Sequence, residues 1–253
     1  MSIVNKICAV IPARYASTRF PGKPLALIKG KSMLQRVYEQ ANHSTSLFEI
    51  IIATDHDAIA LHANSFGAKV VMTSPHHASG TDRIAEVMDL INPPCDIVIN
   101  IQGDEPFIDP EQINKLCAAF EDTHVDIATM AKPITESSDY LNSNVVKVVM
   151  SLSGNALYFS RSPIPHFRNG TESETLPQPV YKHLGMYAYR KSVLKKISML
   201  QVSSLETAEQ LEQLRWLENG FVIRAVITHQ ETIAIDTPED IIKAEFFLSQ
   251  HSK

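Results

Sequence analysis

The chain has 253 residues, of which 44% are hydrophobic and 20% are charged, and its formal net charge is −5. This length allows one large domain or two small ones with a substantial core. The mildly acidic balance argues against general binding to nucleic acid or to a membrane surface, which needs an excess of Lys and Arg. No apolar run reaches the roughly 20 residues of a membrane-spanning helix. No signal-like segment opens the sequence, so we expect a cytoplasmic protein.

The first half of the sequence alternates short apolar runs with amphipathic segments. Runs rich in Ile and Val, typical of strands buried on both faces, are residues 6–11, 49–54, 69–72 and 96–102. The helical patterns between them are residues 33–41, 57–67 and 81–91. Strands that alternate with helices of this length predict an α/β fold with a doubly wound, mostly parallel sheet.

The pattern changes after about residue 125. Residues 144–161 predict a hairpin that turns near Ser153-Gly154, and residues 171–179 form a polar loop. Further strands are predicted at residues 183–190 and 228–235. We therefore expect one α/β domain over residues 1–253, with a smaller, partly antiparallel α+β lobe inserted near residues 132–200. After this lobe we expect the chain to return to the core sheet and to form a C-terminal helix.

The loop after the first predicted strand is unusually basic. Residues 12–23 carry Arg14, Arg19 and Lys23 together with the hydroxyl of Ser17. In an open α/β sheet, ligands bind beyond the carboxyl ends of the strands, which is where this loop lies. Guanidinium, ammonium and hydroxyl donors in one loop predict a polyphosphate site. A solvated basic loop is the alternative.

Two common nucleotide-binding motifs are missing. Gly30-Lys31-Ser32 resembles the end of a P-loop, but Leu25 stands where that motif requires glycine. No GxGxxG occurs in the sequence, so binding of a dinucleotide has little support.

Two aspartates follow predicted strands. Asp104 comes after the fourth strand, and Asp236 closes a later one. Neither is needed to cap the next helix, because Asp109 supplies the start signal of one helix and Thr237, with Asp240 completing a box-like N-terminus, supplies that of the other. Two spare carboxylates and a cationic loop match the needs of a Mg²⁺-nucleotide site. The alternative is that the two aspartates are independent turn residues.

Seven segments carry a resemblance to a known family, in the order IPARYASTRFPGKPL, SGTDR, NIQGDEP, YFSR, HLGMYAY, LEQLRWLENG and IDTPED. From about residue 7 to 245 the chain resembles the bacterial sugar cytidylyltransferases, specifically those that act on 3-deoxy-manno-octulosonate (Kdo). Sugar nucleotidyltransferases in general share the first and third segments in looser form. The resemblance implies a fold of nucleotide-diphospho-sugar transferase type and a homodimer. It also implies the reaction of CTP with Kdo to CMP-Kdo and pyrophosphate, with Mg²⁺, for lipopolysaccharide biosynthesis.

The resemblance also implies roles for individual residues. Those implied to hold the triphosphate are Arg14, Ser17, Arg19 and Lys23. Those implied to lie near the cytidine are Ser79, Gly80, Thr81, Arg83 and Gln102. Those implied to line the sugar pocket are Arg161, His183, Glu206 and Gln213. Asp104 and Asp236 are the implied magnesium ligands. With Lys23 and Arg19, which stabilise the leaving pyrophosphate, they form the expected catalytic set.

Each sugar-side residue also has a structural interpretation. Glu206 lies three residues after Ser203, which is the spacing of a capping box. Glu206, Gln210 and Gln213 fall on one polar helix face, which can equally be solvated. His183 can equally be an ordinary hydrogen-bonded histidine, and Arg161 can equally have a structural role.

Three other functions remain open at this point. The first is a cytidylyltransferase for a related sugar acid, such as 8-amino-Kdo or a sialic acid. The second is a glycosyltransferase that consumes a nucleotide sugar, but such an enzyme is expected to carry Asp-x-Asp where this chain has Asp104-Glu105-Pro106. The third is a nucleotide sensor without catalysis. The inserted lobe is a candidate for the dimer contact, although its apolar strands can also form internal core.

Overall fold

The structure is a computed structural model. It describes residues 5–16, 20–168, 176, 179–230 and 233–251. The chain divides into two compact units, the first formed by residues 1–114 with 231–253 and the second by residues 115–230. Within the described residues, no helix has both the length and the apolar character needed to cross a membrane.

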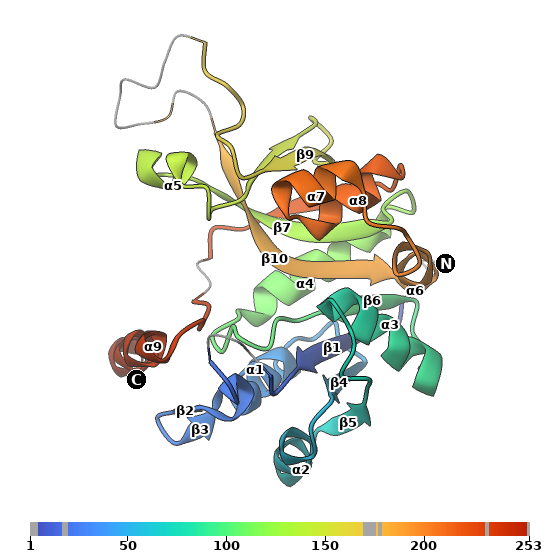
Figure 1. Cartoon of the computed structure of the whole chain (residues 1–253), viewed down its shortest axis with the longest axis vertical. Helices are drawn as coiled ribbons and strands as arrows, with labels where there is room; N and C mark the ends of the chain where they lie inside the picture. The colour runs from blue at the N-terminus through green and yellow to red at the C-terminus, as the bar shows by residue number, and fades with distance from the viewer. Residues whose placement is uncertain (1–4, 17–19, 169–175, 177–178, 231–232, 252–253) are drawn as a thin grey trace. The chain divides into compact units, whose positions relative to one another are not determined.

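The first unit is built on a parallel sheet with strand order β6-β1-β4-β5 (Figure 1). Its strands are β1 (Ile7–Ala13), β4 (Glu49–Thr54), β5 (Lys69–Met72) and β6 (Ile97–Asn100). β1 pairs with β4 on one side and with β6 on the other. The chain thus moves outward from β1 to β5 and then returns to the far side of β1. This reversal is the switch point at which open α/β sheets bind ligands.

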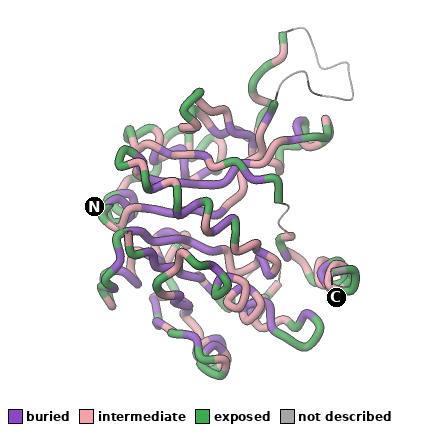
Figure 2. Tube along the Cα trace, turned by 180° about the vertical axis from the view of Figure 1, so that it is seen from behind, coloured by how far each residue is buried: buried purple, intermediate pink, exposed green. Residues whose placement is uncertain are grey.

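Three strands of this sheet, β1, β4 and β6, are buried because branched apolar residues occupy both of their faces. All four residues of β6 are buried, and in β1 only Pro12 is partly exposed. β4 is buried from Ile50 to Thr54. Figure 2 shows these buried residues as continuous purple stretches along the chain. The loops that leave β1 and β6 therefore start from rigid positions.

Helices and a small hairpin complete the first unit. The helices are α1 (Met33–Asn42), α2 (Asp57–Ser65), α3 (Gly80–Ile91), the start of α4 (Pro110–Ala118), α9 (Pro238–His251) and the 3₁₀ turn η1 (Lys23–Leu25). The hairpin strands are β2 (Leu27–Ile28) and β3 (Lys31–Ser32). The hydroxyls of Ser32 and Ser79 cap α1 and α3 by accepting from the backbone N–H of Gln35 and Asp82. The three helices predicted in this half are confirmed.

The C-terminal segment is anchored on the first unit by its own apolar cluster. Ile28, Met33, Ile235 and Ala244 are buried together. The rings of Phe107 and Phe247 add a contact at 5.0 Å between centroids. Because Ile235 is fully buried, the position of its neighbour Asp236 is fixed by packing.

The second unit contains a mixed sheet. Its strands are β7 (Ile127–Pro133), β8 (Lys147–Met150), β9 (Ala156–Ser160), β10 (Tyr181–Arg190) and β11 (Ile223–Ile227). β10 pairs antiparallel with β7 and β8, β8 pairs antiparallel with β9, and β11 runs parallel to β7. The helices are η2 (Ala119–Glu121), α5 (Ser137–Leu141), α6 (Lys191–Ile197), α7 (Ser204–Glu209) and α8 (Glu212–Glu218).

The predicted α/β class with a mixed, largely parallel sheet is confirmed. The hairpin of residues 144–161 is β8–β9, and Gly154 takes φ +82° at its turn. The strand predicted at residues 228–235 is wrong, because β11 lies earlier and the described residues 228–230 and 233–235 form no strand. The alternation there arises because Ile233 and Ile235 pack into the apolar cluster around α9. The lobe near residues 132–200 lies within the second unit, and its bounds remain a prediction. Most of the polar loop of residues 171–179 lies outside the described residues.

A buried lysine organises the loops of the second unit. The side chain of Lys147 is fully buried. Its ammonium donates to the carbonyl oxygens of Asn142 at 2.9 Å, Val145 at 2.7 Å and Arg161 at 2.6 Å. Burial lowers the pKa of Lys147. The carbonyl oxygens compensate the charge, so one cation joins two loops that are distant in the sequence.

We expect Lys147→Met to lower the free energy of unfolding by about 3 kcal/mol, because it leaves buried carbonyl oxygens without a donor. Urea denaturation measures the change. Lys31→Met is the control, since this lysine is 48% exposed and its loss should cost less than about 1 kcal/mol. Equal effects of the two substitutions would show that the Lys147 contacts do not stabilise the fold.

Candidate active site

A cavity of about 320 Å³ opens in the first unit at the carboxyl ends of β1 and β6. Its lining comes from the end of β1, the residues Arg14, Lys23 and Pro24 that follow it, the start of α3 with the residues before it, the loop after β6 and the segment before α9. The lining residues are Pro12, Ala13, Arg14, Lys23, Pro24, His77, Ala78, Ser79, Gly80, Arg83, Gln102, Gly103, Asp104 and Asp236. The cavity thus lies at the switch point of the sheet, where a ligand site is expected.

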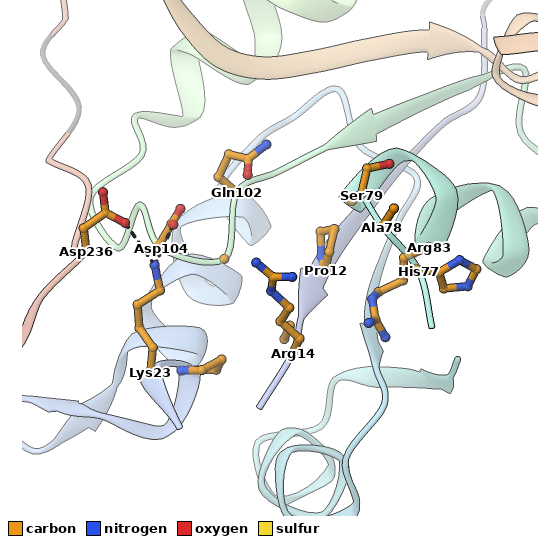
Figure 3. A pocket seen from close by; sticks show the side chains of 14 residues that line it. Pro12, Arg14, Lys23, His77, Ala78, Ser79, Arg83, Gln102, Asp104 and Asp236 are labelled. Atoms are coloured by element: carbon orange, nitrogen blue, oxygen red, sulfur yellow. Dashed lines mark hydrogen bonds and ion pairs between the residues drawn. The ribbon is translucent and has the colours of Figure 1, made fainter. Parts of the chain in front are cut away.

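The cavity has two chemically different ends. Figure 3 shows Lys23, Asp104 and Asp236 together at one end. The segment from His77 to Arg83 forms the other end, and the side chains of Arg14 and Gln102 lie between the two (Figure 3). An elongated ligand can therefore contact carboxylates at one end and the start of a helix at the other.

The carboxylates of Asp104 and Asp236 converge on one cation. The ammonium of Lys23 lies 2.8 Å from Asp104 Oδ2 and 3.5 Å from Asp236 Oδ1. It also donates to the carbonyl oxygen of Ile235 at 2.9 Å. The two chain segments are joined by the backbone, because the N–H of Ile235 donates to the carbonyl oxygen of Asp104 at 2.9 Å. The structure thus brings together the two aspartates that the sequence singled out.

Neither aspartate is used to cap the next helix. Asp109 caps α4 by accepting from the N–H of Glu111 at 2.9 Å. At α9 the capping group is the carboxylate of Asp240, which accepts from the N–H groups of Asp236 and Thr237 at 3.2 and 3.0 Å. The Lys243 ammonium and these donors hold the pKa of Asp240 well below its usual value. Asp240 therefore completes the helix start as expected, and the Thr237 hydroxyl donates to the same carboxylate at 3.1 Å.

The two carboxylates have the chemistry of a Mg²⁺ site. Mg²⁺ takes one or two protein carboxylates and completes its octahedron with water and phosphate oxygens. The side chains of Asp104 and Asp236 are 30% and 45% exposed, so both can reach such ligands. Among the described residues, no three His, Cys, Asp or Glu side chains gather into a metal cage. Burial and the Asp104 charge raise the pKa of the neighbouring Glu105 to about 7, which makes that group a poor third ligand.

The opposite end of the cavity is formed by the first turn of α3. Ser79, Gly80 and Arg83 line it as expected, whereas Thr81 is buried and is not among the lining residues. The guanidinium of Arg83 is itself buried and donates to Asp55 at 2.8 Å and to the hydroxyl of Thr73. Arg83 thus presents a fixed, internally paired cation to the cavity.

A backbone hydrogen bond joins the two described parts of the basic loop after β1. The N–H of Gly22 donates to the carbonyl oxygen of Tyr15 at 3.0 Å, and the Tyr15 ring stacks on His56 at 4.1 Å. Arg14, just before this closure, is exposed and lines the cavity. Ser17 and Arg19, both expected at the triphosphate, lie outside the described residues.

Sequence reasoning missed Gly103 as a site residue. A Cβ at this position would lie 2.8 Å from the carbonyl oxygen of Pro12, closer than real Cβ contacts. Only glycine therefore lets the loop after β6 pack this closely against the end of β1. The available signal was a glycine directly after a buried strand, which often marks a close backbone approach.

The four expected sugar-pocket residues all lie in the second unit. His183 contacts the hydroxyl of Thr129 through Nε2 at 2.9 Å. Arg161 donates to the carbonyl oxygen of Glu209 at 2.8 Å. Gln213 is buried, and its Nε2 has no hydrogen-bond partner within the described part of the chain. Their role in sugar binding remains a prediction.

The structural interpretation of Glu206 is confirmed. Ser203 and Glu206 form a capping box at α7, and the Glu206 carboxylate also accepts from the guanidinium of Arg215. The single polar face expected for Glu206, Gln210 and Gln213 is wrong. The chain leaves the helix at Gln210, which has φ +53°, so α7 and α8 are separate helices.

This arrangement defines a class of protein. A switch-point cavity with a carboxylate pair, a lysine, an exposed arginine and a helix start is typical of an α/β protein that binds a nucleotide with its metal. The comparison with known proteins narrows the class, because residues 8–233 match the family model described as cytidylyltransferase. The chain belongs to the cytidylyltransferase family.

Individual relatives cover almost the whole chain. A protein of Parabacteroides distasonis named 3-deoxy-manno-octulosonate cytidylyltransferase is 52% identical over 249 residues, 96% of this chain and 98% of the relative. One of Bacteroides thetaiotaomicron with the same name is 52% identical over 98% of this chain and 100% of the relative. A structure of CMP:2-keto-3-deoxy-manno-octonic acid synthetase complexed with CTP matches with a TM-score of 0.90 and 41% identity, over 97% of this chain and 99% of that one.

We expect Gly103→Ala to lower the free energy of unfolding by about 2 kcal/mol, because the added methyl group forces the loop after β6 away from the end of β1. Urea denaturation measures this. Gly185→Ala is the matched control: nothing lies within 4 Å of its Cβ position, so we expect no loss there. A Gly103→Ala protein as stable as the control would contradict the close approach to Pro12.

The stability of the protein should depend on pH through His183. Its ring packs against Phe159 and Tyr187, and burial lowers its pKa to about 4 from 6.5. Above pH 6.5 the ring is neutral in both states and has no effect. As the pH falls from 6.5 to 4 the unfolded chain binds the proton first, which lowers the free energy of unfolding by up to about 3 kcal/mol.

We expect His183→Gln to flatten the pH dependence of unfolding between pH 6.5 and 4. The measurement is urea denaturation at several pH values. His76→Gln, at an exposed position, is the control and should keep the wild-type slope. An unchanged slope in the His183 variant would mean that its ring is protonated equally in both states.

Proposed function

We propose that this chain transfers CMP from CTP to the anomeric hydroxyl of Kdo and releases pyrophosphate. The observation that carries the proposal is the convergence of Asp104 and Asp236 beside Lys23 in the switch-point cavity. Support comes from relatives named 3-deoxy-manno-octulosonate cytidylyltransferase and from the CTP complex of a structure that matches over nearly the full chain.

The charges of the cavity favour one orientation of CTP. Its triphosphate belongs beside Arg14 and Lys23, because these cations lie at and next to the carboxylate end. Its base then lies toward the start of α3, near Ser79 and Gly80. Gln102, between the two ends, is in position to contact the ribose or the base. From the resemblance, Ser17 and Arg19 add further donors to the triphosphate.

Asp104 and Asp236 are the residues that would hold Mg²⁺. The ion, when bound, supplies positive charge at the α-phosphate and favours loss of the proton from the attacking hydroxyl. The chain holds both carboxylates in place through the Asp104–Ile235 backbone bond and the Asp240 cap. A preorganised pair of ligands loses little entropy when the ion arrives.

The reaction is an in-line displacement at phosphorus. The anomeric oxygen of Kdo bonds to the α-phosphorus while the bond to the β-phosphate oxygen breaks. Arg14 and Lys23 keep the triphosphate aligned and stabilise the charge that grows on the leaving pyrophosphate. No side chain needs to form a covalent intermediate, so positioning and charge account for the catalysis.

The contacts of the second unit favour two of its residues as sugar ligands. The buried Nε2 of Gln213 is a donor without a partner among the described residues, and a sugar hydroxyl would satisfy it. His183, kept neutral by its lowered pKa, can donate or accept. The guanidinium of Arg161 and the carboxylate of Glu206 already have internal partners. These two residues therefore position the pocket more than they bind the sugar.

Membership of the cytidylyltransferase family leaves the glycosyltransferase and the nucleotide sensor without a supporting observation. A related sugar acid in place of Kdo is the remaining alternative. The homodimer and the cytoplasmic location stay predictions.

The test is a pyrophosphate-release assay with Mg²⁺, each of the four NTPs, and a panel of Kdo, 8-amino-Kdo and sialic acid. We expect release only with CTP and Kdo together. Release with CTP and the amino sugar alone would keep the reaction and change the acceptor. Release with no sugar acid at all would overturn the proposal.

We expect Asp104→Asn and Asp236→Asn each to lower kcat by about 100-fold or more, because each removes a charge that stabilises the transition state through the ion. The same assay measures the rates. Asp109→Asn is the matched control, since asparagine caps a helix as well as aspartate and the site is untouched. A near-normal rate in either test variant, with a folded protein, would exclude that carboxylate as a metal ligand.

A further inference from the structure

The position between the two carboxylates is taken by a side chain of the chain itself. The ammonium of Lys23 makes its three described contacts with Asp104 Oδ2 at 2.8 Å, the Ile235 carbonyl oxygen at 2.9 Å and Asp236 Oδ1 at 3.5 Å. The Lys23 side chain is 15% exposed, less than either carboxylate. Lys23 is therefore set among these oxygens and does not extend toward solvent.

An ammonium and a metal ion compete for such a position. Mg²⁺ would bind oxygen at about 2.0–2.1 Å, so an ion held by both carboxylates would compete with the Lys23 ammonium for their oxygens. Two cations held by the same carboxylates repel each other strongly in a partly buried site. The lysine and the ion therefore exclude each other there.

We propose that Lys23 is the internal counter-ion of the Asp104–Asp236 pair in the metal-free protein, and that the metal displaces it toward the phosphates. This inference rests on the proposed function for the identity of the metal ligands. It adds that one residue has two alternating partners, the carboxylates without metal and the triphosphate with it.

The local backbone permits this exchange by the side chain alone. Lys23 begins η1, a turn held by bonds from Leu25 N–H to the Gly22 carbonyl oxygen at 2.9 Å and from Ala26 N–H to the Lys23 carbonyl oxygen at 3.1 Å. Pro24 is buried and fixes the turn further. The lysine side chain has a flexible four-carbon stem, so the ammonium can leave the carboxylates while the Lys23 Cα stays in place.

Charge explains why the exchange runs in this direction. The two carboxylates and the Lys23 ammonium by themselves sum to a charge of −1, which attracts a divalent cation. An ion that neutralised both carboxylates would remove the ionic partners of the ammonium, which would then be attracted to the triphosphate beside Arg14. Binding of metal and of CTP thereby become linked, since each favours the position of Lys23 that the other needs.

The test measures the affinity of the protein for Mn²⁺ alone, without nucleotide, by isothermal titration. We expect Lys23→Met to bind Mn²⁺ about fivefold to tenfold more tightly than the wild type, because an ion pair of this exposure no longer competes. Arg14→Met is the matched control: it removes a cation of the same cavity whose contacts do not include either carboxylate, and we expect a change below about twofold. Unchanged or weaker binding by Lys23→Met would overturn the exchange.

Two further measurements separate the possible failures. Asp104→Asn should lose Mn²⁺ binding in both the wild-type and the Lys23→Met background. If it does not, the metal ligands of the proposed function are wrong, whatever Lys23 does.

The second measurement uses the wild-type protein, so it does not depend on how the variants fold. Amine acetylation followed by mass spectrometry should show faster labelling of Lys23 when Mg²⁺ saturates the protein. Lys69 is the internal reference. Its ammonium lies 2.8 Å from the carboxylate of Glu49, neither residue lines the cavity, and its labelling should not change. Equal labelling of Lys23 with and without Mg²⁺ would also overturn the exchange.

Discussion

The site depends on one backbone hydrogen bond between segments far apart in the sequence. The N–H of Ile235 donates to the carbonyl oxygen of Asp104, and the carbonyl oxygen of Ile235 accepts from Lys23. Ile235 is fully buried in the apolar cluster around α9, so the packing of the C-terminal helix fixes this contact. Without it, nothing in the sheet would hold Asp236 beside Asp104. A helix that contributes no side chain to the cavity thus determines its chemistry.

The sheet sets the rest of the geometry. β1 and β6 are adjacent and buried on both faces, so the loops that follow them begin side by side. The loop after β6 approaches the end of β1 so closely that only glycine fits at residue 103. Polar side chains on these loops therefore start from fixed backbone positions, which is the preorganisation that charge stabilisation of a transition state requires.

The sequence was informative where local rules decide the structure. Runs of Ile and Val located the buried strands, and cap signals at Asp109 and Asp240 left Asp104 and Asp236 without a structural task. The wrong strand at residues 228–235 shows the limit, because alternating apolar residues look the same in a strand and in a coil that packs against a helix. The contact of Lys23 with both carboxylates was also beyond the sequence, since it depends on the fold that joins residues 23, 104 and 236.

The use of cations explains how a chain of net charge −5 can attract a polyphosphate. Several cations that are buried or nearly so have internal partners: Arg83 has Asp55, Arg215 has Glu206, and Lys147 has carbonyl oxygens. The first two are ion pairs, and the charge of Lys147 is held inside the fold, so none of these cations lines the cavity as a free charge. The exposed Arg14 lines the cavity directly, and the proposed change of partner would make the charge of Lys23 available there as well. Attraction for phosphate is therefore local, and under the proposed exchange it would be strongest once a metal ion had displaced Lys23 from the carboxylates.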